Sequence, residues 1–258
     1  MVYRARPADG VAWVTGASSG IGRGAALELA RRGWRVFATA RRERELQALE
    51  SQAAGLKGSI AAAPGDVTDR AKMAALVARI ESEAPIALAL LNAGGNFADA
   101  PGDFGGDGFA KTIELNLQGA VNALNPVFNA MRSRRRGQIA IMGSLAGYGG
   151  LPRGGAYCPS KAAVISLAEG LRFAAAPDNL TVQVVNPGYV KTPLTDRNDF
   201  AMPFLMECER ACRRLCDGLE RGGFEIRFPT RLALIMRLVS TLPYPLYFAF
   251  YSAGARRK

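Results

Sequence analysis

Residues 11–22 are Val-Ala-Trp-Val-Thr-Gly-Ala-Ser-Ser-Gly-Ile-Gly, and this stretch decides the fold. Its first five residues form a short apolar run typical of a buried strand, and an apolar helical pattern follows as far as Arg32. The turn between them has three glycines in the spacing GxxxGxG, at Gly16, Gly20 and Gly22. Such a strand–turn–helix unit points free backbone N–H groups at a phosphate, and glycine lets the backbone approach it closely. We therefore expect a phosphate-binding turn here.

Short β-branched runs and longer helical patterns alternate along the rest of the chain. We expect further strands at Arg35–Ala40, Ser59–Ala63, Ile86–Leu91, Gln138–Met142 and Thr181–Val185. Helices are expected at Glu43–Ala54, Lys72–Glu83, Gly108–Met131 and Tyr157–Ala175. This alternation predicts an α/β fold with a doubly wound parallel sheet, a Rossmann-type α/β/α sandwich. We expect one domain over residues 1–258, with a core at 8–228 and an apolar C-terminal helical extension at 229–258.

The composition narrows the chemistry. The 258 residues include no histidine, which excludes Ser-His-Asp triads, Cys-His pairs and histidine-based zinc sites. The net charge is +11, but the basic residues are spread along the chain without a nucleic-acid-binding motif. The densest run, Arg132 with Arg134, Arg135 and Arg136, has the pattern of a solvated helix end. We therefore expect no nucleic-acid partner.

Four cysteines are present, Cys158, Cys208, Cys212 and Cys216. The last three recur every four residues, as small apolar side chains on one helix face would, and no CxxC or zinc-finger spacing occurs. We expect no metal site. The amino terminus has no apolar run typical of a secretory signal, so we expect a reducing, cytoplasmic setting.

The end of the second expected strand indicates which dinucleotide is bound. NAD-binding folds usually place a carboxylate about 20 residues after the glycines to hold the ribose 2′-hydroxyl. Here Arg41 and Arg42 stand at the strand end, and the first carboxylate is Glu43. Two guanidiniums suit a 2′-phosphate, although they would also suit the start of a solvated helix. We expect NADP, with NADPH preferred over NADH.

Several motifs together resemble the short-chain dehydrogenase/reductase family in its compact single-domain branch. They cover about residues 10–192 and comprise, in the order typical of the family, Thr15-Gly-x-x-x-Gly-Ile-Gly22, Asp66-Val67, Asn92-Ala93-Gly94, Asn116, Ser144, Tyr157-x-x-x-Lys161 and Pro187-Gly188. Two departures are small: Leu91 stands where a second Asn is common, and Gly143 where a Ser is common. After Thr192 the resemblance fades.

The resemblance implies a catalytic set of Asn116, Ser144, Tyr157 and Lys161. Tyr157 and Lys161 are four apart on an expected helix and so share a face. An ammonium and an oxidised nicotinamide ring both favour phenolate, so we expect a lowered tyrosine pKa that suits a general acid and base. The Ser144 hydroxyl would hold the reacting oxygen, and by resemblance Asn116 would hold a water that relays protons from Lys161.

The expected cofactor-binding residues follow from the same motifs. They are Gly16, Ser18, Ser19, Gly20, Ile21, Gly22, Arg41, Arg42, Asp66, Val67, Asn92, Ala93, Gly94, Tyr157, Lys161, Pro187, Gly188, Val190 and Thr192. The predicted function is an NADP-dependent oxidoreductase that interconverts a ketone or aldehyde and an alcohol on an apolar small molecule. The alternative is a non-catalytic nucleotide sensor or scaffold on the same fold, which often lacks the Tyr or the Lys.

The C-terminal part departs from the family pattern. We expect a helix at Phe204–Arg221, a short strand at Phe224–Phe228, and then an apolar segment with no acidic residue after Glu225. Residues 238–255 carry no charge but include two prolines, which weakens a membrane-spanning interpretation. We expect protein to bury this segment, in a substrate pocket or in the interface of a homo-oligomer. Peripheral contact with a membrane is the alternative.

Overall fold

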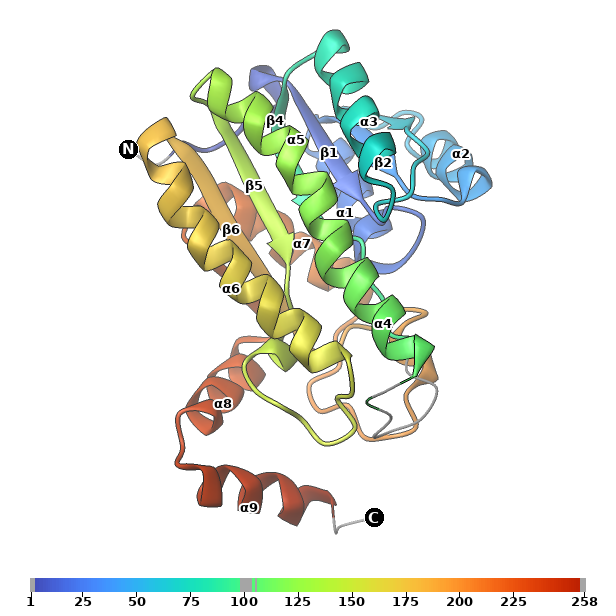
Figure 1. The fold of residues 1–258 in the computed structure, drawn as a ribbon. Helices are drawn as coiled ribbons and strands as arrows, with labels where there is room; N and C mark the ends of the chain where they lie inside the picture. Colours follow the sequence, from blue (N-terminus) through green and yellow to red (C-terminus); the bar gives the residue numbers. More distant parts are fainter. Residues whose placement is uncertain (1–2, 98–103, 105, 256–258) are drawn as a thin grey trace.

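The computed structural model describes residues 3–97, 104 and 106–255, with the backbone alone for 253–255. Its centre is a seven-stranded, fully parallel sheet in the order β3-β2-β1-β4-β5-β6-β7 (Figure 1). The strands are β1 (Val11–Thr15), β2 (Arg35–Thr39), β3 (Ser59–Ala62), β4 (Ile86–Leu91), β5 (Gly137–Met142), β6 (Leu180–Pro187) and β7 (Glu225–Phe228). The strand order reverses between β1 and β4, as in a doubly wound sheet, so the fold prediction is confirmed.

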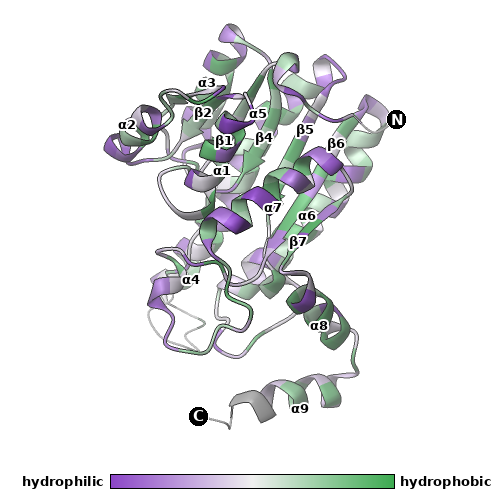
Figure 2. Ribbon diagram, turned by 180° about the vertical axis from the view of Figure 1, so that it is seen from behind, coloured by the Kyte–Doolittle hydropathy of each residue, from purple (hydrophilic) through white to green (hydrophobic). Residues whose placement is uncertain are grey.

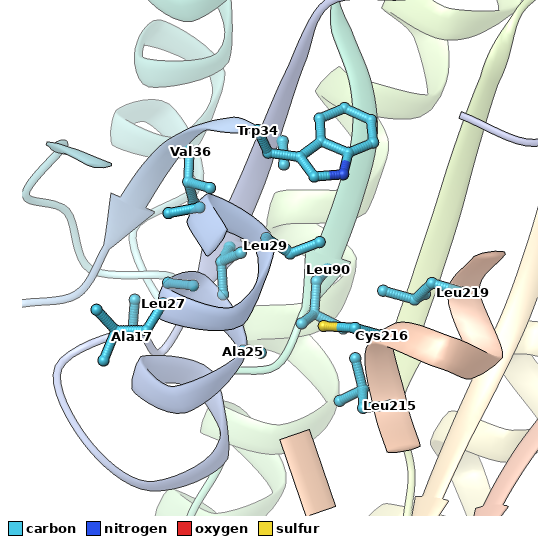
Figure 3. Packing of buried hydrophobic residues seen from close by; sticks show 14 of the residues in the cluster. Ala17, Ala25, Leu27, Leu29, Trp34, Val36, Leu90, Leu215, Cys216 and Leu219 are labelled. Atoms are coloured by element: carbon cyan, nitrogen blue, oxygen red, sulfur yellow. The ribbon is translucent and has the colours of Figure 1, made fainter. Parts of the chain in front are cut away.

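Helices cover both faces of the sheet. The first face carries α1 (Gly20–Arg31), α2 (Glu43–Gln52) and α7 (Cys208–Arg221), and the second carries α3 (Arg70–Glu83), α5 (Gly119–Ser133) and α6 (Tyr157–Ala175). All residues of β1, β4, β5 and β6 are buried, as expected for parallel strands between two helix layers. Figure 3 shows Leu215 and Cys216 of α7 directed toward Leu90 of β4 and toward α1.

Two expected helices differ from the structure. The helix expected over Gly108–Met131 is divided into α4 (Asp107–Ile113), a π-helical segment at Glu114–Gln118, and α5. The helix expected from Phe204 begins only at Cys208. Phe204 has a φ of +60°, which no α-helix accommodates, and Met206 pairs with Val190 in an isolated β-bridge. The prediction of a helix start at Phe204 is therefore wrong.

Two more helices, α8 (Thr230–Ser240) and α9 (Tyr244–Ala255), form the tail. They lie beyond the carboxyl edge of the sheet, outside the two helix layers (Figures 1 and 2). The tail buries Leu232, Ala233, Val239 and Tyr247. Met236, Leu242 and Tyr251 are half-buried, and the exposed large apolar side chains are Leu234, Ile235, Leu238, Tyr244, Leu246, Phe248 and Phe250. The chain's own core therefore buries only one side of the tail, and no helix among the described residues is long and apolar enough to cross a membrane.

Candidate active site

A cavity of about 300 Å³ lies at the carboxyl edge of the sheet, where the strand order reverses between β1 and β4. Ligands of open α/β sheets bind at this position because neighbouring loops diverge there. Most of the residues predicted from the sequence line the cavity: Gly16, Ser18, Ser19, Gly20, Ile21, Arg41, Arg42, Asp66, Val67, Asn92, Ala93, Gly94, Tyr157, Lys161, Pro187 and Thr192. The fold thus brings together motifs that are separated by up to 176 residues in the sequence, from Gly16 to Thr192.

The phosphate turn is built on close backbone contacts. Gly16 has a φ of +67° and Gly20 a φ of +54°, conformations that side chains with a Cβ rarely adopt. At Gly22 a Cβ would lie 2.3 Å from Asn92 Nδ2 and 2.4 Å from the Gly16 oxygen. The Asn92 amide donates to the Thr15 and Gly16 carbonyls at 3.0 and 3.3 Å. The turn is thus held against the end of β4 before any ligand binds.

Two arginines stand at the end of β2. Arg42 Nη2 donates to Ser18 Oγ in the phosphate turn at 2.9 Å. Arg41 Nη1 lies 3.9 Å from Asp66 Oδ2, and the other Asp66 oxygen accepts from the Thr68 backbone and hydroxyl. Both guanidiniums are exposed and line the cavity. Their N–H donors therefore face the space that a 2′-phosphate on the ribose would occupy if the pyrophosphate of the dinucleotide lay at the phosphate turn.

Asn116 lies in the π-helical segment behind the cavity wall. Its Nδ2 donates to the Gly95 carbonyl and to Ser160 Oγ, each at 2.9 Å, and its Oδ1 accepts from the Gly95 N–H at 2.8 Å. A Cβ on Gly94 would lie 3.0 Å from Asn116 Oδ1 and 3.3 Å from Lys161 Nζ. Asn116 and Lys161 therefore meet beneath Gly94, and the π-helical turn sets the position of the asparagine.

Lys161 is buried on α6, one turn after Tyr157. Its ammonium donates to the Met142 carbonyl at 2.8 Å and lies 5.7 Å from the centre of the Tyr157 ring. Burial disfavours the charged form and lowers the pKa of Lys161 to about 8. A single carbonyl partner at the end of β5 thus keeps a lysine in the protein interior beside the tyrosine.

The pKa of Tyr157 differs from the sequence-based expectation. Burial raises this pKa in the protein alone, and a hydrogen bond with the Ser144 hydroxyl opposes the rise only in part. The lowering expected from Lys161 together with an oxidised nicotinamide ring is not present in the protein alone, because desolvation of the phenolate outweighs the hydrogen bond that stabilises it. Tyr157 is thus a protonated phenol near neutral pH in the protein alone.

Ser144 begins a short 3-10 turn after β5. Its Oγ accepts from the Ala146 N–H at 3.1 Å, donates to the Pro187 carbonyl at 3.3 Å, and bonds with the Tyr157 phenol. The ends of β5 and β6 together therefore fix this hydroxyl. Of the predicted catalytic residues, Tyr157 and Lys161 line the cavity, whereas Ser144 and Asn116 lie just outside its lining, next to Gly143 and Leu115.

Three of the predicted cofactor residues, Gly22, Gly188 and Val190, do not line the cavity. Gly22 supports the turn from beneath, and Gly188 packs under α8, where a Cβ would lie 2.9 Å from Leu232 Cδ2. Val190 is buried in the core. Sequence analysis missed other lining residues: Ala40, Gly65, Gly95, Leu115, Met142, Gly143, Pro193 and Leu194. Each lies within two positions of a motif residue, and that closeness in sequence is the signal that could have found them.

Three of the four cysteines, Cys208, Cys212 and Cys216, lie on α7, which packs against α1, and Cys158 lies on α6. Cys212 and Cys216 are buried, and a Cβ on Gly24 of α1 would lie 2.5 Å from Cys212 Sγ. This packing confirms the interpretation of these cysteines as small apolar side chains on a helix face. Within residues 3–97, 104 and 106–255, no group of three or more Cys, Asp or Glu side chains could hold a metal ion.

Comparisons with known proteins agree with this geometry. The family model described as "short chain dehydrogenase" matches residues 10–201. A Myxococcus xanthus protein named "Uncharacterized oxidoreductase" is 40% identical over 249 residues, covering 95% of this chain and 96% of its own. The "Monensin polyketide synthase putative ketoacyl reductase" of Streptomyces virginiae is 34% identical over 194 residues, covering 72% of this chain and 73% of its own.

A solved structure is similar over almost the whole fold. It is described as "Short-chain dehydrogenase from Sphingobium yanoikuyae in complex with NADPH" and has a TM-score of 0.78 and 26% sequence identity. The match covers 91% of this chain and 96% of that one. The strand order and the position of the cavity thus belong to a fold that binds a nicotinamide dinucleotide in that protein.

Proposed function

The chain belongs to the short-chain dehydrogenase family and is an NAD(P)-dependent oxidoreductase, and we propose that it interconverts a carbonyl compound and an alcohol with Tyr157 as general acid and base. One observation carries this proposal. Tyr157 and Lys161 line the same cavity as the phosphate turn, and Ser144 directly follows the lining residue Gly143. A reacting carbonyl beside Tyr157 would therefore lie within reach of a dinucleotide that follows the turn.

The cavity residues fit NADP. The phosphate turn offers backbone N–H groups to the pyrophosphate, and Arg41 with Arg42 offers guanidinium donors to a 2′-phosphate. The absence of a Cβ on Gly94 leaves room above Asn116 and Lys161. When bound, the nicotinamide supplies or accepts the hydride. The NADPH complex of the Sphingobium protein supports the choice of a nicotinamide cofactor.

The protein's own residues supply the proton and orient the substrate oxygen. The Ser144 hydroxyl, which accepts from the Ala146 N–H, would turn its proton from the Pro187 carbonyl to the substrate carbonyl oxygen and limit the position of that oxygen. Tyr157 gives its phenol proton to the same oxygen during reduction and takes it back during oxidation. The Lys161 ammonium stabilises the phenolate that remains, because it is held beside the ring in a region of low dielectric.

We further propose that Asn116 links Lys161 to solvent through a water molecule. Its side chain fixes the backbone at Gly95, and its position next to Lys161 beneath Gly94 supports this relay. A proton lost from Tyr157 during reduction would be replaced along this route. The π-helical turn supports the same role because such turns often occur at functional sites.

The substrate is proposed to be lipophilic. Next to Ser144, the side chains of Leu145, Leu232 and Ala233 form an apolar cluster with Tyr148, Tyr189 and Met236. This apolar cluster beside Ser144 favours a ketone with hydrocarbon on at least one side of the carbonyl. The similarity to a ketoacyl reductase of a polyketide synthase supports this class.

A cytoplasmic homo-oligomer is the arrangement that we propose, because dimers and tetramers are common in the family.

The decisive variant is Tyr157→Phe, which removes the phenol oxygen and little else. We expect turnover of a lipophilic ketone to fall by about 10²–10⁴-fold, while the dissociation constant for NADPH stays within about twofold. Tyr244→Phe is the matched control because Tyr244 is exposed on α9. Retained turnover in Tyr157→Phe would exclude the mechanism. NADPH binding without turnover of any carbonyl compound by the native protein would favour a nucleotide sensor.

A second experiment tests the cofactor choice. Replacing both Arg41 and Arg42 by Ala should raise the dissociation constant for NADPH by about tenfold or more and leave that for NADH unchanged, because charge-assisted hydrogen bonds contribute about 1.5–3 kcal/mol each. Arg44→Ala on the exposed side of α2 is the control. Equal affinity of the native protein for the two dinucleotides would show that the arginines do not select a 2′-phosphate.

A further inference from the structure

Helix α8 has two apolar faces. The inner face buries Leu232, Ala233 and Val239, and its Leu232 contacts the core beside Gly188. On the outer face, the exposed residues Arg231, Leu234, Ile235 and Leu238 recur at i, i+3, i+4 and i+7. This spacing places them in one stripe along the helix. The chain's own packing explains the inner face, whereas Leu234, Ile235 and Leu238 on the outer face remain exposed among the described residues.

Helix α9 continues this apolar surface. It contains no charged residue and rests on the body through Tyr247, whose hydroxyl donates to the Gly150 carbonyl at 2.5 Å. A surface helix normally has a polar face, whereas a helix that is apolar all round requires cover. We name the exposed side chains of both helices the tail surface: Leu234, Ile235, Leu238, Tyr244, Leu246, Phe248 and Phe250.

The charged residues of the two tail helices are both basic. Arg231 and Arg237 are exposed on α8, and α9 has no charged residue. No acidic residue follows Glu225 in the sequence. In a twofold contact between copies of this chain, the same patch meets itself, so these cations would face one another without carboxylates from the tail. A surface with many anions and an apolar layer would complement both the basic charge and the exposed apolar side chains of the tail.

We propose that the tail surface binds the interfacial layer of a membrane containing anionic phospholipid. The twelve residues of α9 span about 18 Å at 1.5 Å per residue, well short of a hydrocarbon core about 30 Å thick. The helix therefore lies in the plane of the interface, with its Tyr, Phe and Leu side chains among the acyl chains and the basic residues at the lipid headgroups.

The position of α9 places the bound membrane beside the active site. Tyr247 holds α9 on residues 149–150, in the connection between Ser144 and Tyr157. The apolar cluster of Leu145 and Leu232 joins the inner face of α8 to the same connection. A lipophilic molecule dissolved in the membrane would thus lie near the apolar cluster that follows Ser144. Membrane binding itself does not depend on the proposed reaction.

Co-sedimentation of the full chain with lipid vesicles tests the proposal. We expect binding to vesicles of phosphatidylcholine with phosphatidylglycerol, weak binding to phosphatidylcholine alone, and a loss of binding as salt is raised. The double variant Leu238→Gln/Leu246→Gln should lower the partition coefficient by about tenfold or more. Phe173→Gln is the matched control, since Phe173 is an apolar side chain on α6 that is 81% exposed.

Arg231→Gln tests the charge contribution separately. It should weaken binding to the anionic vesicles by about fivefold, as expected for one basic residue near an anionic membrane, and Arg79→Gln on α3 should not. Circular dichroism and NADPH binding confirm that each variant is folded. Reduction of a water-soluble ketone should be unchanged in all of them, so a failure to bind vesicles leaves the proposed reaction untouched.

Three results would overturn the proposal. The first is no binding to anionic vesicles. The second is binding that Phe173→Gln weakens as much as the double variant does. The third is an oligomer, measured by light scattering, that dissociates in the double variant without any lipid affinity of the native chain. That last result would assign the tail surface to a second copy of the chain.

Discussion

The phosphate turn and the tail are both rich in small or apolar residues, yet opposite constraints act on them. In the turn, Gly22 lies so close to Asn92 and Gly16 that a methyl group would collide with them. In the tail, the side chains of Leu238 and Phe248 are mostly exposed. Contacts within the chain fix the composition of the first region. The composition of the second depends on a surface that the chain itself does not supply.

Helix α8 has one face of each kind. Its inner face packs next to the active site, because Leu232 packs against Gly188 and clusters with Leu145, the residue after Ser144. Its outer face carries a side-chain pattern of similar hydropathy that is exposed. Hydropathy alone therefore does not distinguish the residues of α8 that stabilise the fold from those that form the tail surface. Measuring the stability of variants on each face does distinguish them.

The largest expected effect comes from comparing one leucine on each face. Leu232→Ala should lower the free energy of unfolding by about 2–5 kcal/mol, because the side chain is 7% exposed and its loss leaves a cavity. Leu238→Ala should change it by less than about 0.5 kcal/mol, since Leu238 is 67% exposed. Urea unfolding followed by circular dichroism measures both values. Equal losses would mean that protein covers both faces of α8.

A smaller effect should appear in the pH dependence of stability. The pKa of Lys161 is lowered from 10.5 to about 8 in the folded protein, so the unfolded chain binds more protons between these values. Stability therefore rises with pH in this window and does not change below it on account of this group. Relative to Lys161→Met, the native protein should gain about 2–3 kcal/mol between pH 7 and pH 10.

Urea titrations of both proteins across this range measure the gain, and contributions from other titrating groups cancel in the difference. A difference that is constant with pH would mean that Lys161 titrates as an exposed lysine. This result would contradict the burial of Lys161 against the Met142 carbonyl and the tight packing around the active site.

The strands and the motif residues could be predicted because their causes are local. The runs at Val11–Thr15 and Ile86–Leu91 coincide with β1 and β4, since strands buried on both faces need continuous apolar residues. One helix boundary could not be predicted equally well. The helix start moved from Phe204 to Cys208 because a left-handed residue and a β-bridge intervene, and the pattern of apolar residues contains neither signal.

The sequence predicted which residues form the site but not their pKa values. Tyr157 and Lys161 line the expected cavity, yet the pKa of Tyr157 is raised because burial of the phenol depends on the packing around it. The π-helical turn that positions Asn116 was also not foreseen, since it resembles an α-helix in sequence. The exposure of the outer face of α8 required the structure, because its hydropathy is compatible with burial.

The smallest expected effect concerns the tight packing of the phosphate turn. Gly22→Ala would place a Cβ 2.3 Å from Asn92 Nδ2, so either the turn or β4 must shift. We expect a loss of about 1–3 kcal/mol in the free energy of unfolding, as for other overpacked sites, together with weaker NADPH binding. Gly170→Ala on α6 is the matched control, because nothing lies within 4 Å of the added Cβ. Alanine there should stabilise the helix by about 0.5–1 kcal/mol. Thermal and urea unfolding with a fluorescence titration of NADPH measure these changes. If both variants kept full stability and affinity, the turn would tolerate side chains. Close packing at Gly22 would then not be a constraint that sets the turn apart from the tail.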